Sequence, residues 1–154
     1  MAVDVEFRLA TPEDGRALLA NLREADRQEL IASDGDPERA ILGSLRDSVW
    51  AVSTLINGEF ACIHGLAPID GLLGSRASPW MLGTPVIDKH PSVLVRASVW
   101  YRDLMLGQYP HLLNFVDARN TRSIRWLKRL GFTIHPAYVF EGRTHPFHLF
   151  EMRK

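Results

Sequence analysis

Four ionisable residues lie within or at the ends of apolar runs and could act on a proton: His64, Asp88, His111 and Asp117. Imidazoles and carboxylates are the side chains that most often serve as general bases. His64 stands inside its run, where a packed histidine is the ordinary alternative, and Asp117 could equally cap the turn before Asn120. Spacing distinguishes none of the four, and His64, Asp88 and Asp117 are kept as candidate catalytic residues.

Positive charge gathers near two predicted helix starts. Lys89 and His90 precede one, while Arg119 and Arg122 flank Asn120 at the other. A cation at a helix N-terminus opposes the helix dipole by ~0.3 to 1 kcal/mol, so either solvent screens it or an anion binds there. The alternatives are a solvated loop for Lys89 and His90 and a plain helix cap for Asn120. These five residues are the candidate anion-binding residues.

Several other chemistries find no support in the sequence. The six histidines and one cysteine have no spacing typical of a metal site, and His145 and His148 fall on opposite faces of a predicted strand. Nucleophile-elbow, Walker and dinucleotide motifs are missing. The basic stripe of the last helix lacks the interleaved aromatic residues of a nucleic-acid platform. We therefore expect neither a metal ion nor a nucleic-acid partner.

Length and charge favour one ordinary globular domain over residues 1–154. The chain carries 18 acidic and 18 basic residues, so any electrostatic steering must come from local patches. The single Cys62 excludes an intramolecular disulfide, and no apolar run approaches the roughly 18 residues of a membrane span. The first ten residues do not resemble a signal peptide. We expect a cytoplasmic protein without a membrane partner.

Hydrophobic periodicity and capping signals predict the elements that position these residues. In chain order they are a strand at 3–9, helices at 12–32 and 36–45, strands at 49–56 and 59–65 joined by Asn57-Gly58, a loop at 66–79, a strand at 79–87, a helix at 92–107, a strand at 111–116, a helix at 121–130, and strands at 133–140 and 146–152. This order predicts an α/β fold with a mixed, mostly antiparallel sheet flanked by four helices, in which helical crossovers bring strands in parallel.

Two helices have predicted buried faces. In the last helix Ile124, Leu127 and Leu130 share one side, and Gly131 ends the helix at little conformational cost. The preceding helix has one broad apolar face, made by Val93, Leu94, Ala97, Trp100, Tyr101, Leu104 and Met105.

The stretch from Leu113 to Phe132 carries a family resemblance. Asn120 opens a helix after a buried strand, and Leu130-Gly131-Phe132 closes it. This resembles the fourth helix of the GNAT superfamily, whose members transfer an acyl group from coenzyme A to an amine. Within that superfamily, the sequence of this stretch is most similar to that of small acetyltransferase-like proteins encoded by tailed phages. The predicted element order is also the GNAT order, so the resemblance implies a GNAT-like single domain using acetyl-coenzyme A.

The site residues depart from the pattern that this resemblance implies. GNAT enzymes hold the coenzyme A pyrophosphate on a glycine-rich turn at the start of the third helix, but the matching stretch from Ile87 to Val93 contains no glycine, and Pro91 removes one donor. Leu127 stands where many members have a tyrosine that protonates the departing thiolate. Contacts to the cofactor would fall to Asn120, Arg119 and Arg122 at one helix start and to Lys89 and His90 at the other.

Two hypotheses remain open. The first is a divergent acyl-coenzyme A dependent N-acyltransferase, phage-encoded, that acts on a small-molecule or protein amine. The second is a catalytically degenerate GNAT-fold binding protein that engages a host enzyme or a virion component in the host cytoplasm. The missing glycine turn and tyrosine favour the second hypothesis. The sequence thus predicts weak coenzyme A binding and slow or absent catalysis.

Overall fold

The computed structural model describes residues 2–71 and 73–154. Its elements are β1 (Val5–Leu9), α1 (Pro12–Ala20), α2 (Glu24–Ser33), α3 (Pro37–Asp47), β2 (Trp50–Ile56), β3 (Glu59–Pro68), β4 (Arg76–Gly83), the 3₁₀ helix η1 (Pro85–Lys89), α4 (Pro91–Gln108), β5 (His111–Asp117), α5 (Thr121–Leu130), β6 (Thr133–Ile134) and β7 (Phe147–Arg153). None of the helices in this part of the chain has the length and apolar character needed to cross a bilayer.

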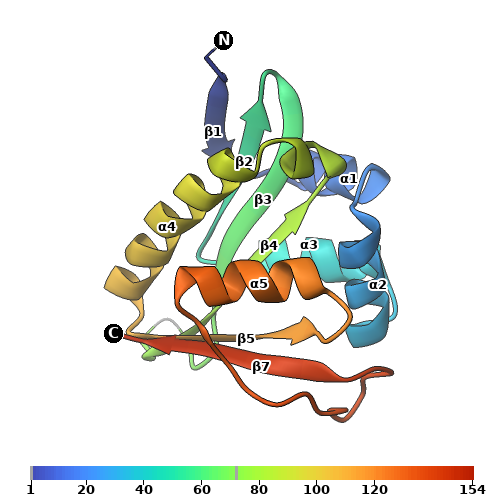
Figure 1. Ribbon diagram of the computed structural model, residues 1–154, viewed down its shortest axis with the longest axis vertical. Coiled ribbons are helices and arrows are strands. Elements are labelled where there is room, and N and C mark those ends of the chain that lie inside the picture. The colour runs from blue at the N-terminus through green and yellow to red at the C-terminus, as the bar shows by residue number, and fades with distance from the viewer. Residues whose placement is uncertain (1, 72) are drawn as a thin grey trace.

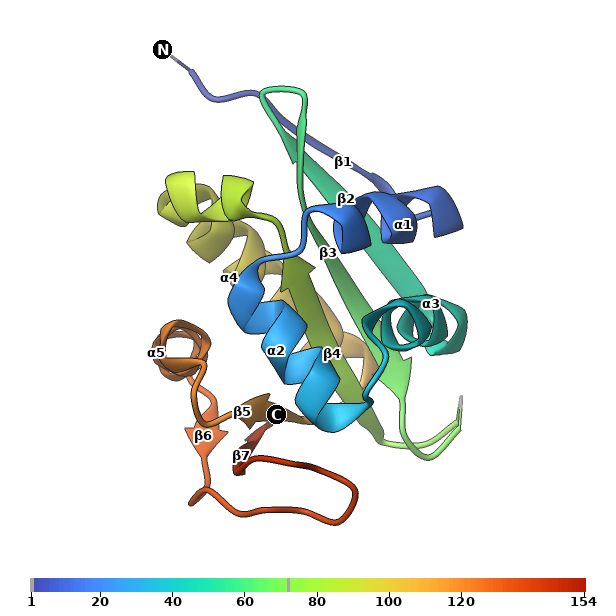
Figure 2. The same ribbon diagram turned by 90° about the vertical axis from the view of Figure 1, so that its right-hand side faces the viewer.

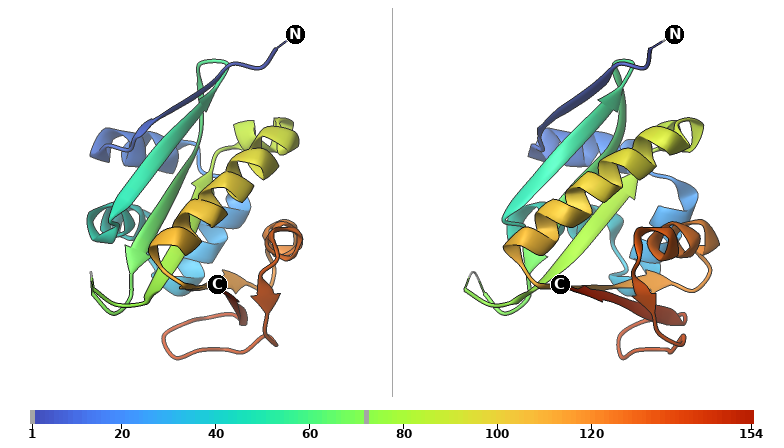
Figure 3. Two further views of the ribbon diagram at one scale, coloured as in Figure 1. Left: turned by 90° about the vertical axis from the view of Figure 1, so that its left-hand side faces the viewer. Right: turned by 60° about the vertical axis from the view of Figure 1, so that its left-hand side comes forward.

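The seven strands form one sheet in the order β1-β2-β3-β4-β5-β7-β6. Helices α1, α2 and α3 cover one face, and α4 and α5 cover the other (Figures 1 and 2). Figure 3 shows α4 lying across its face of the sheet. Among the strand pairs of the described residues, β4–β5 alone is parallel, so the mixed, mostly antiparallel α/β sheet is confirmed. Two helical crossovers do bring strands in parallel, as expected: α4 connects β4 to β5, and α5 connects β5 to β6, which runs parallel to it on the other side of β7. The helical connection from β1 to β2 joins antiparallel neighbours.

The predicted helix at 12–32 is wrong, because two helices occupy it. The described residues accordingly form five α-helices, not four. The break lies at Arg23, which has an extended backbone and donates its N–H to the Gly83 carbonyl at 2.9 Å. Its guanidinium also binds Asp26. Contacts with a distant strand therefore override the local preference for a continuous helix.

Local turn and cap signals are confirmed. The Thr11 hydroxyl and the Asp36 carboxylate each accept backbone N–H bonds at the start of a helix. At the β2–β3 hairpin Asn57 and Gly58 have φ of 51° and 79°, the left-handed backbone that a tight hairpin turn requires. These features depend on neighbouring residues, which explains why they can be read from the sequence.

The strand predicted at 79–87 has the wrong bounds. β4 starts at Arg76 and stops at Gly83, and β3 extends to Pro68, so both strands take residues from the predicted loop at 66–79. Residue 72 of that loop lies outside the described residues. The Thr84 hydroxyl accepts the Val86 N–H at 3.3 Å and starts η1, since Pro85 has no N–H for a strand ladder.

The core-facing sides of α4 and α5 position the site. In α5, Leu127 and Leu130 are buried, and Gly131 adopts φ 98°, both as predicted. In α4, Tyr101 and Met105 are buried, but Trp100 is 61% exposed. The predicted apolar face of α4 is therefore too broad, because this helix contacts the sheet along a narrower line.

The strand predicted at 133–140 is also wrong beyond its start. β6 contains only Thr133–Ile134, and a single bridge from Tyr138 to Phe147 follows. Pro136 cannot donate to the ladder, so the chain leaves the sheet there. The loop that follows passes beneath the end of α2 before β7 begins (Figure 2).

Candidate functional site

The sheet opens between β4 and β5. Their ladder contains only the pairs Arg76 with His111 and Ala77 with Leu112. Beyond it, side chains bridge the strands: Ser78 Oγ donates to the Leu113 carbonyl at 3.0 Å, and Asn114 Nδ2 donates to the Pro79 carbonyl at 2.9 Å. From there β5 turns away at a steep angle to β4, so the second half of β4 has an open edge (Figure 1).

A cleft of about 610 Å³ lies at this opening. Its lining comes from α2 and α3 on one face of the sheet and from α4 and α5 on the other. Two ligands could therefore approach each other from opposite faces and meet between the strands. The sequence could not predict this cleft, since strand order and splay depend on the whole fold.

On the open edge of β4, the backbone groups on either side of Met81 are bonded to other described residues. The Gly83 N–H donates to Asp26 at 2.9 Å, and its carbonyl accepts from Arg23. The Pro79 carbonyl is bound by Asn114. Because alternate residues of a strand point the same way, Met81 presents its N–H and carbonyl between these two occupied positions. Met81 also lines the cleft, so its N–H can donate to an oxygen bound there.

Glu29 of α2 lies where β5 ends and was missed by the sequence analysis. Its Oε1 accepts the Asp117 backbone N–H at 2.7 Å. Burial raises the pKa of Glu29 to about 7, and the nearby charges of Asp26 and Asp117 act in the same direction, against the lowering effects of that hydrogen bond and of the Asn120 side chain. A carboxylate with this pKa is half ionised near neutral pH and can accept a proton. In the sequence Glu29 looks like any helical glutamate.

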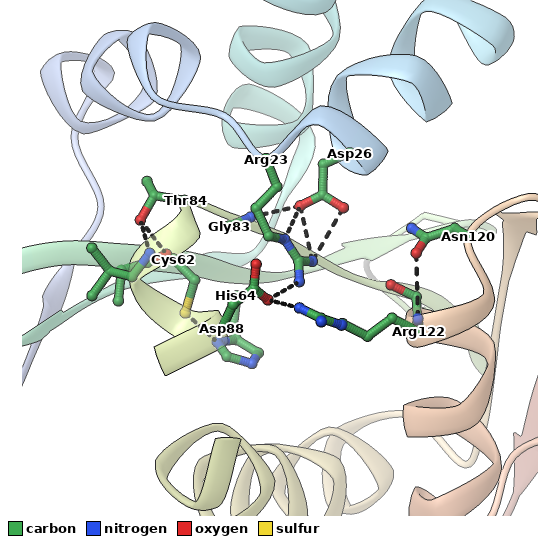
Figure 4. Close-up of polar contacts among 12 residues, drawn as sticks. Arg23, Asp26, Cys62, His64, Gly83, Thr84, Asp88, Asn120 and Arg122 are labelled. Carbon is green, nitrogen blue, oxygen red and sulfur yellow. Dashed lines mark hydrogen bonds and ion pairs between the residues drawn. The ribbon is translucent and has the colours of Figure 1, made fainter. Parts of the chain in front are cut away.

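Asp88, a predicted catalytic candidate, is bound by two arginines. Its Oδ1 binds Arg23 at 3.2 Å and Arg122 at 2.7 Å, and Arg23 in turn holds the buried Asp26 (Figure 4). The Asp88 carboxylate thus joins η1 to α5 and neutralises Arg122, one of the predicted anion-binding residues. An incoming anion would have to compete with Asp88 for that guanidinium.

The start of α4 offers few donors to an anion. The N–H groups of Val93 and Leu94 both bond to the His90 carbonyl, and Pro91 has none. The Ser92 N–H is what remains of the first turn. Lys89 is exposed at the end of η1 and could add charge but not a fixed backbone contact.

The residues that begin α5 are held by local bonds. Asn120 Oδ1 accepts the Ser123 N–H at 3.3 Å, so Asn120 is a helix cap. Its buried Nδ2 makes no hydrogen bond of strict geometry among the described residues, but it lies close enough to the Glu29 carboxylate to lower the pKa of that group. Arg119 binds the Asp117 carboxylate through its backbone and guanidinium. Burial opposes the charged form of Asp117, but these bonds outweigh burial and hold the pKa of Asp117 below its usual range.

The two candidate histidines have separate surroundings. His64 is buried, its Nδ1 lies 3.7 Å from Cys62 Sγ, and its ring stacks on Tyr101 at 4.6 Å. Burial lowers the pKa of His64 to about 4, so it is neutral near pH 7. His111 bonds to Glu151 at the paired end of β5, away from the opening.

Other cleft residues lack partners for their polar groups. Ser98 Oγ of α4 and Trp126 Nε1 of α5 are buried without a hydrogen bond to any described residue, as is His64 Nε2. All three residues line the cleft. Buried polar groups are normally paired, so a polar ligand between α4 and α5 would satisfy them. Tyr101 is the tyrosine on the cleft lining, and burial raises its pKa to about 12.

Solved structures with a similar fold are acetyltransferases. A GNAT-family acetyltransferase from Streptococcus pneumoniae aligns with TM-score 0.62 and 14% identity over 97% of this chain and 99% of that one. A ribosomal-protein-alanine N-acetyltransferase from Brucella melitensis aligns with TM-score 0.67 and 17% identity over 97% and 99%. The aminoglycoside acetyltransferase AAC(6')-Ib, in complex with ribostamycin and coenzyme A, has TM-score 0.70 and 15% identity over 98% and 94%. The chain has the GNAT fold. Identities this low establish the fold alone.

Sequence comparison identifies a phage relative of one segment. A family model described as bacteriophage T7, probable scaffold protein Gp13, matches residues 86–139. The probable scaffold protein gp13 of Escherichia phage T7 is 43% identical over 54 residues, which are 35% of this chain and 37% of that protein. The match thus spans little more than a third of the relative's length and runs from η1 through α4, β5 and α5 to the start of the loop after β6.

Proposed function

We propose that this protein binds an acyl-coenzyme A in the cleft between β4 and β5 and transfers the acyl group to an amine. The observation that carries the proposal is the position of Glu29. Its carboxylate has a pKa of about 7 and lies at the end of β5, where the cleft connects the two helical layers. Sequence patterns single out no general base, and in this proposal Glu29 is the general base.

The cleft fits the amide-containing chain of coenzyme A better than it fits the phosphates. The unpartnered Ser98 Oγ and Trp126 Nε1 could bond to a chain that carries amide groups, and so could Asn120 Nδ2, which also lies beside Glu29. The start of α4 suits phosphates poorly, because Pro91 and the bonded amides leave few donors and Asp88 already occupies Arg122. Binding is therefore weak, and Lys89, His90, Arg119 and Arg122 contribute through charge.

When bound, acyl-coenzyme A would supply a thioester carbon for the amine to attack. Glu29 accepts the proton that an ammonium group must lose before its nitrogen can react. The Met81 N–H donates to the oxygen of the reacting carbonyl group. Leu127 cannot protonate the departing thiolate, so water does so and turnover is slow. The protein would carry out this reaction in the cytoplasm.

Release of free coenzyme A from acetyl-coenzyme A tests this proposal. The assay uses a panel of amino acids, polyamines, aminoglycosides and lysine peptides, with the parent protein and Asn120→Ala. Turnover above the amine-free background, reduced in Asn120→Ala, supports the proposal. Release at background with every amine, together with no heat of binding when acetyl-coenzyme A is titrated into the protein, contradicts it.

The phage match raises a second candidate function. The segment at 86–139 is shared with a probable scaffold protein, and it contains the poorly suited phosphate region. In this alternative the protein is phage-encoded and catalytically degenerate, and its GNAT fold engages a host enzyme or a virion component. A partner captured by the parent protein and retained by Asn120→Ala, with acyl transfer absent, would favour this alternative.

A further inference from the structure

Arg143 lies in the turn before β7 and enters the cleft from the α2 side. Its N–H donates to the Phe140 carbonyl at 3.1 Å, and the next residue, Thr144, donates its N–H to Ala32 at the end of α2. The guanidinium carbon lies 4.4 Å from the ring centroid of Phe115 and 4.3 Å from that of Phe147. The turn is thus fixed to α2, and the guanidinium is held on two aromatic rings.

The donors of this guanidinium are unused. Arg143 forms no side-chain hydrogen bond or ion pair with any residue that the structure describes, whereas most arginines of this chain bind an aspartate or a glutamate. Burial lowers the pKa of Arg143, and the charge of Glu29 opposes that effect. The group nevertheless remains a cation, since arginine stays protonated in proteins. A half-buried cation with free N–H groups is suited to an anion from solution.

The place of Arg143 connects this site to the proposed reaction. Arg143, Glu29 and Phe115 all line the cleft, on the side covered by α2. Glu29 is close enough to influence the charge of Arg143, yet the two do not form an ion pair. A ligand could therefore place an amine at Glu29 and an anion at Arg143 together.

We propose that the amine substrate carries a carboxylate, which Arg143 binds, and that it is a free amino acid or a similarly small amino carboxylate. A guanidinium offers two parallel N–H donors that match the geometry of a carboxylate. The inference rests on the proposed acyl transfer. Glu29 takes a proton from the ammonium group, and the nitrogen bonds to the thioester carbon and loses its second proton to water. The carbon–sulfur bond breaks with its electron pair leaving on sulfur, and water protonates the resulting thiolate. Arg143 takes no part in these bond changes and acts by positioning the substrate.

The opposing view is that Arg143 only covers the aromatic rings beneath it. Paired substrates separate the two accounts. Acyl transfer is measured with the common amino acids and with their carboxamides, which keep the amine and lose the negative charge. The proteins are the parent, Arg143→Gln and Arg46→Gln. Arg46 is the matched control because it also lines the cleft but is 77% exposed in its side chain and paired with Asp47.

The proposal expects the parent to prefer an amino acid over its carboxamide. In Arg143→Gln the KM for the amino acid should rise by roughly 10- to 100-fold, as expected for loss of a charge-assisted pair, while the carboxamide reacts as before. Arg46→Gln should keep the preference. Equal use of both substrate forms by the parent, or a preference that survives Arg143→Gln, would overturn the proposal.

A binding experiment distinguishes failure of this inference from failure of the proposed function. Tryptophan fluorescence reports on the cleft because Trp80 and Trp126 line it. If no amine is acylated, the acyltransferase proposal fails. A saturable fluorescence change with an amino acid, lost in Arg143→Gln, would then still support the carboxylate site. No saturable change with any amino acid would overturn that site as well.

Discussion

The Glu29 carboxylate accepts the backbone N–H of Asp117 at 2.7 Å, and the two residues lie 88 positions apart in the chain. This bond joins α2 to the end of β5 beside the opening in the sheet. It fixes a carboxyl group whose pKa is about 7 at the point where the cleft meets both helical layers. A structural contact thus also positions the proposed base.

Ionisation of Glu29 should reduce stability as the pH rises. Its pKa is raised from 4.5 to about 7 on folding, so the contribution of the proton is complete below pH 4.5 and is lost as the pH passes 7. The loss should be about 1 to 3 kcal/mol. Glu29→Gln keeps an acceptor for Asp117 and cannot ionise, so its stability relative to the parent should increase between pH 5 and pH 8. Urea unfolding at several pH values measures this.

The comparison with the parent is needed because His64 acts in the opposite sense. Its pKa is lowered from 6.5 to about 4, so stability falls as the pH drops through that range. The two effects overlap below pH 6.5, but His64 is present in both proteins and its contribution cancels in the difference. A difference between Glu29→Gln and the parent that does not change with pH would show that Glu29 has an ordinary pKa.

The inner face of α5 should not tolerate charge. Leu127 is 5% exposed and packs in the main core, whereas Arg125 is exposed on the same helix. Leu127→Asp buries an unpaired carboxylate and should unfold the domain or destabilise it by roughly 4 kcal/mol or more. Arg125→Asp is the control and should stay folded. Thermal unfolding followed by circular dichroism decides the matter, and a Leu127→Asp protein as heat-stable as the parent would contradict this packing.

Coenzyme A binding should depend strongly on salt. With few backbone donors at the start of α4, its phosphates would rely on side-chain charges, which ions screen over about 10 Å at 0.1 M salt. Arg122→Ala should weaken binding, and Asp88→Asn should strengthen it, because Asp88 no longer competes for Arg122. Calorimetric titration at low and high salt measures both variants. Equal affinity at both salt concentrations, or no effect of either substitution, counts against this arrangement.

The sequence predicted the parts of the fold that depend on neighbouring residues. Asn120 and Gly131 mark the two ends of α5, and Asn57-Gly58 forms the turn of the β2–β3 hairpin. Each of these residues determines the backbone conformation at or next to its own position. Arg23 shows the limit of such reasoning. Its surroundings favour a helix, but bonds to Gly83 and Asp26 interrupt it.

The candidate site was less accessible to sequence reasoning. The sequence marks Asp88 and Asp117 as candidate bases, but arginines hold both carboxylates. Glu29 is one of the two glutamates of a short polar helix, and Arg143 lies in a turn, so neither type nor spacing marks them. Their roles come from the opening between β4 and β5, which no local pattern encodes.

The most direct test of the account is the pH dependence of acyl transfer by the parent and by Glu29→Gln, with acetyl-coenzyme A binding checked by calorimetry in both. The account predicts that kcat/KM of the parent increases through an apparent pKa of about 7. Glu29→Gln should bind acetyl-coenzyme A as the parent does, lose that titration and react about 10²- to 10⁴-fold more slowly. A folded Glu29→Gln protein that transfers the acyl group at the parent's rate, with the same pH dependence, would contradict it.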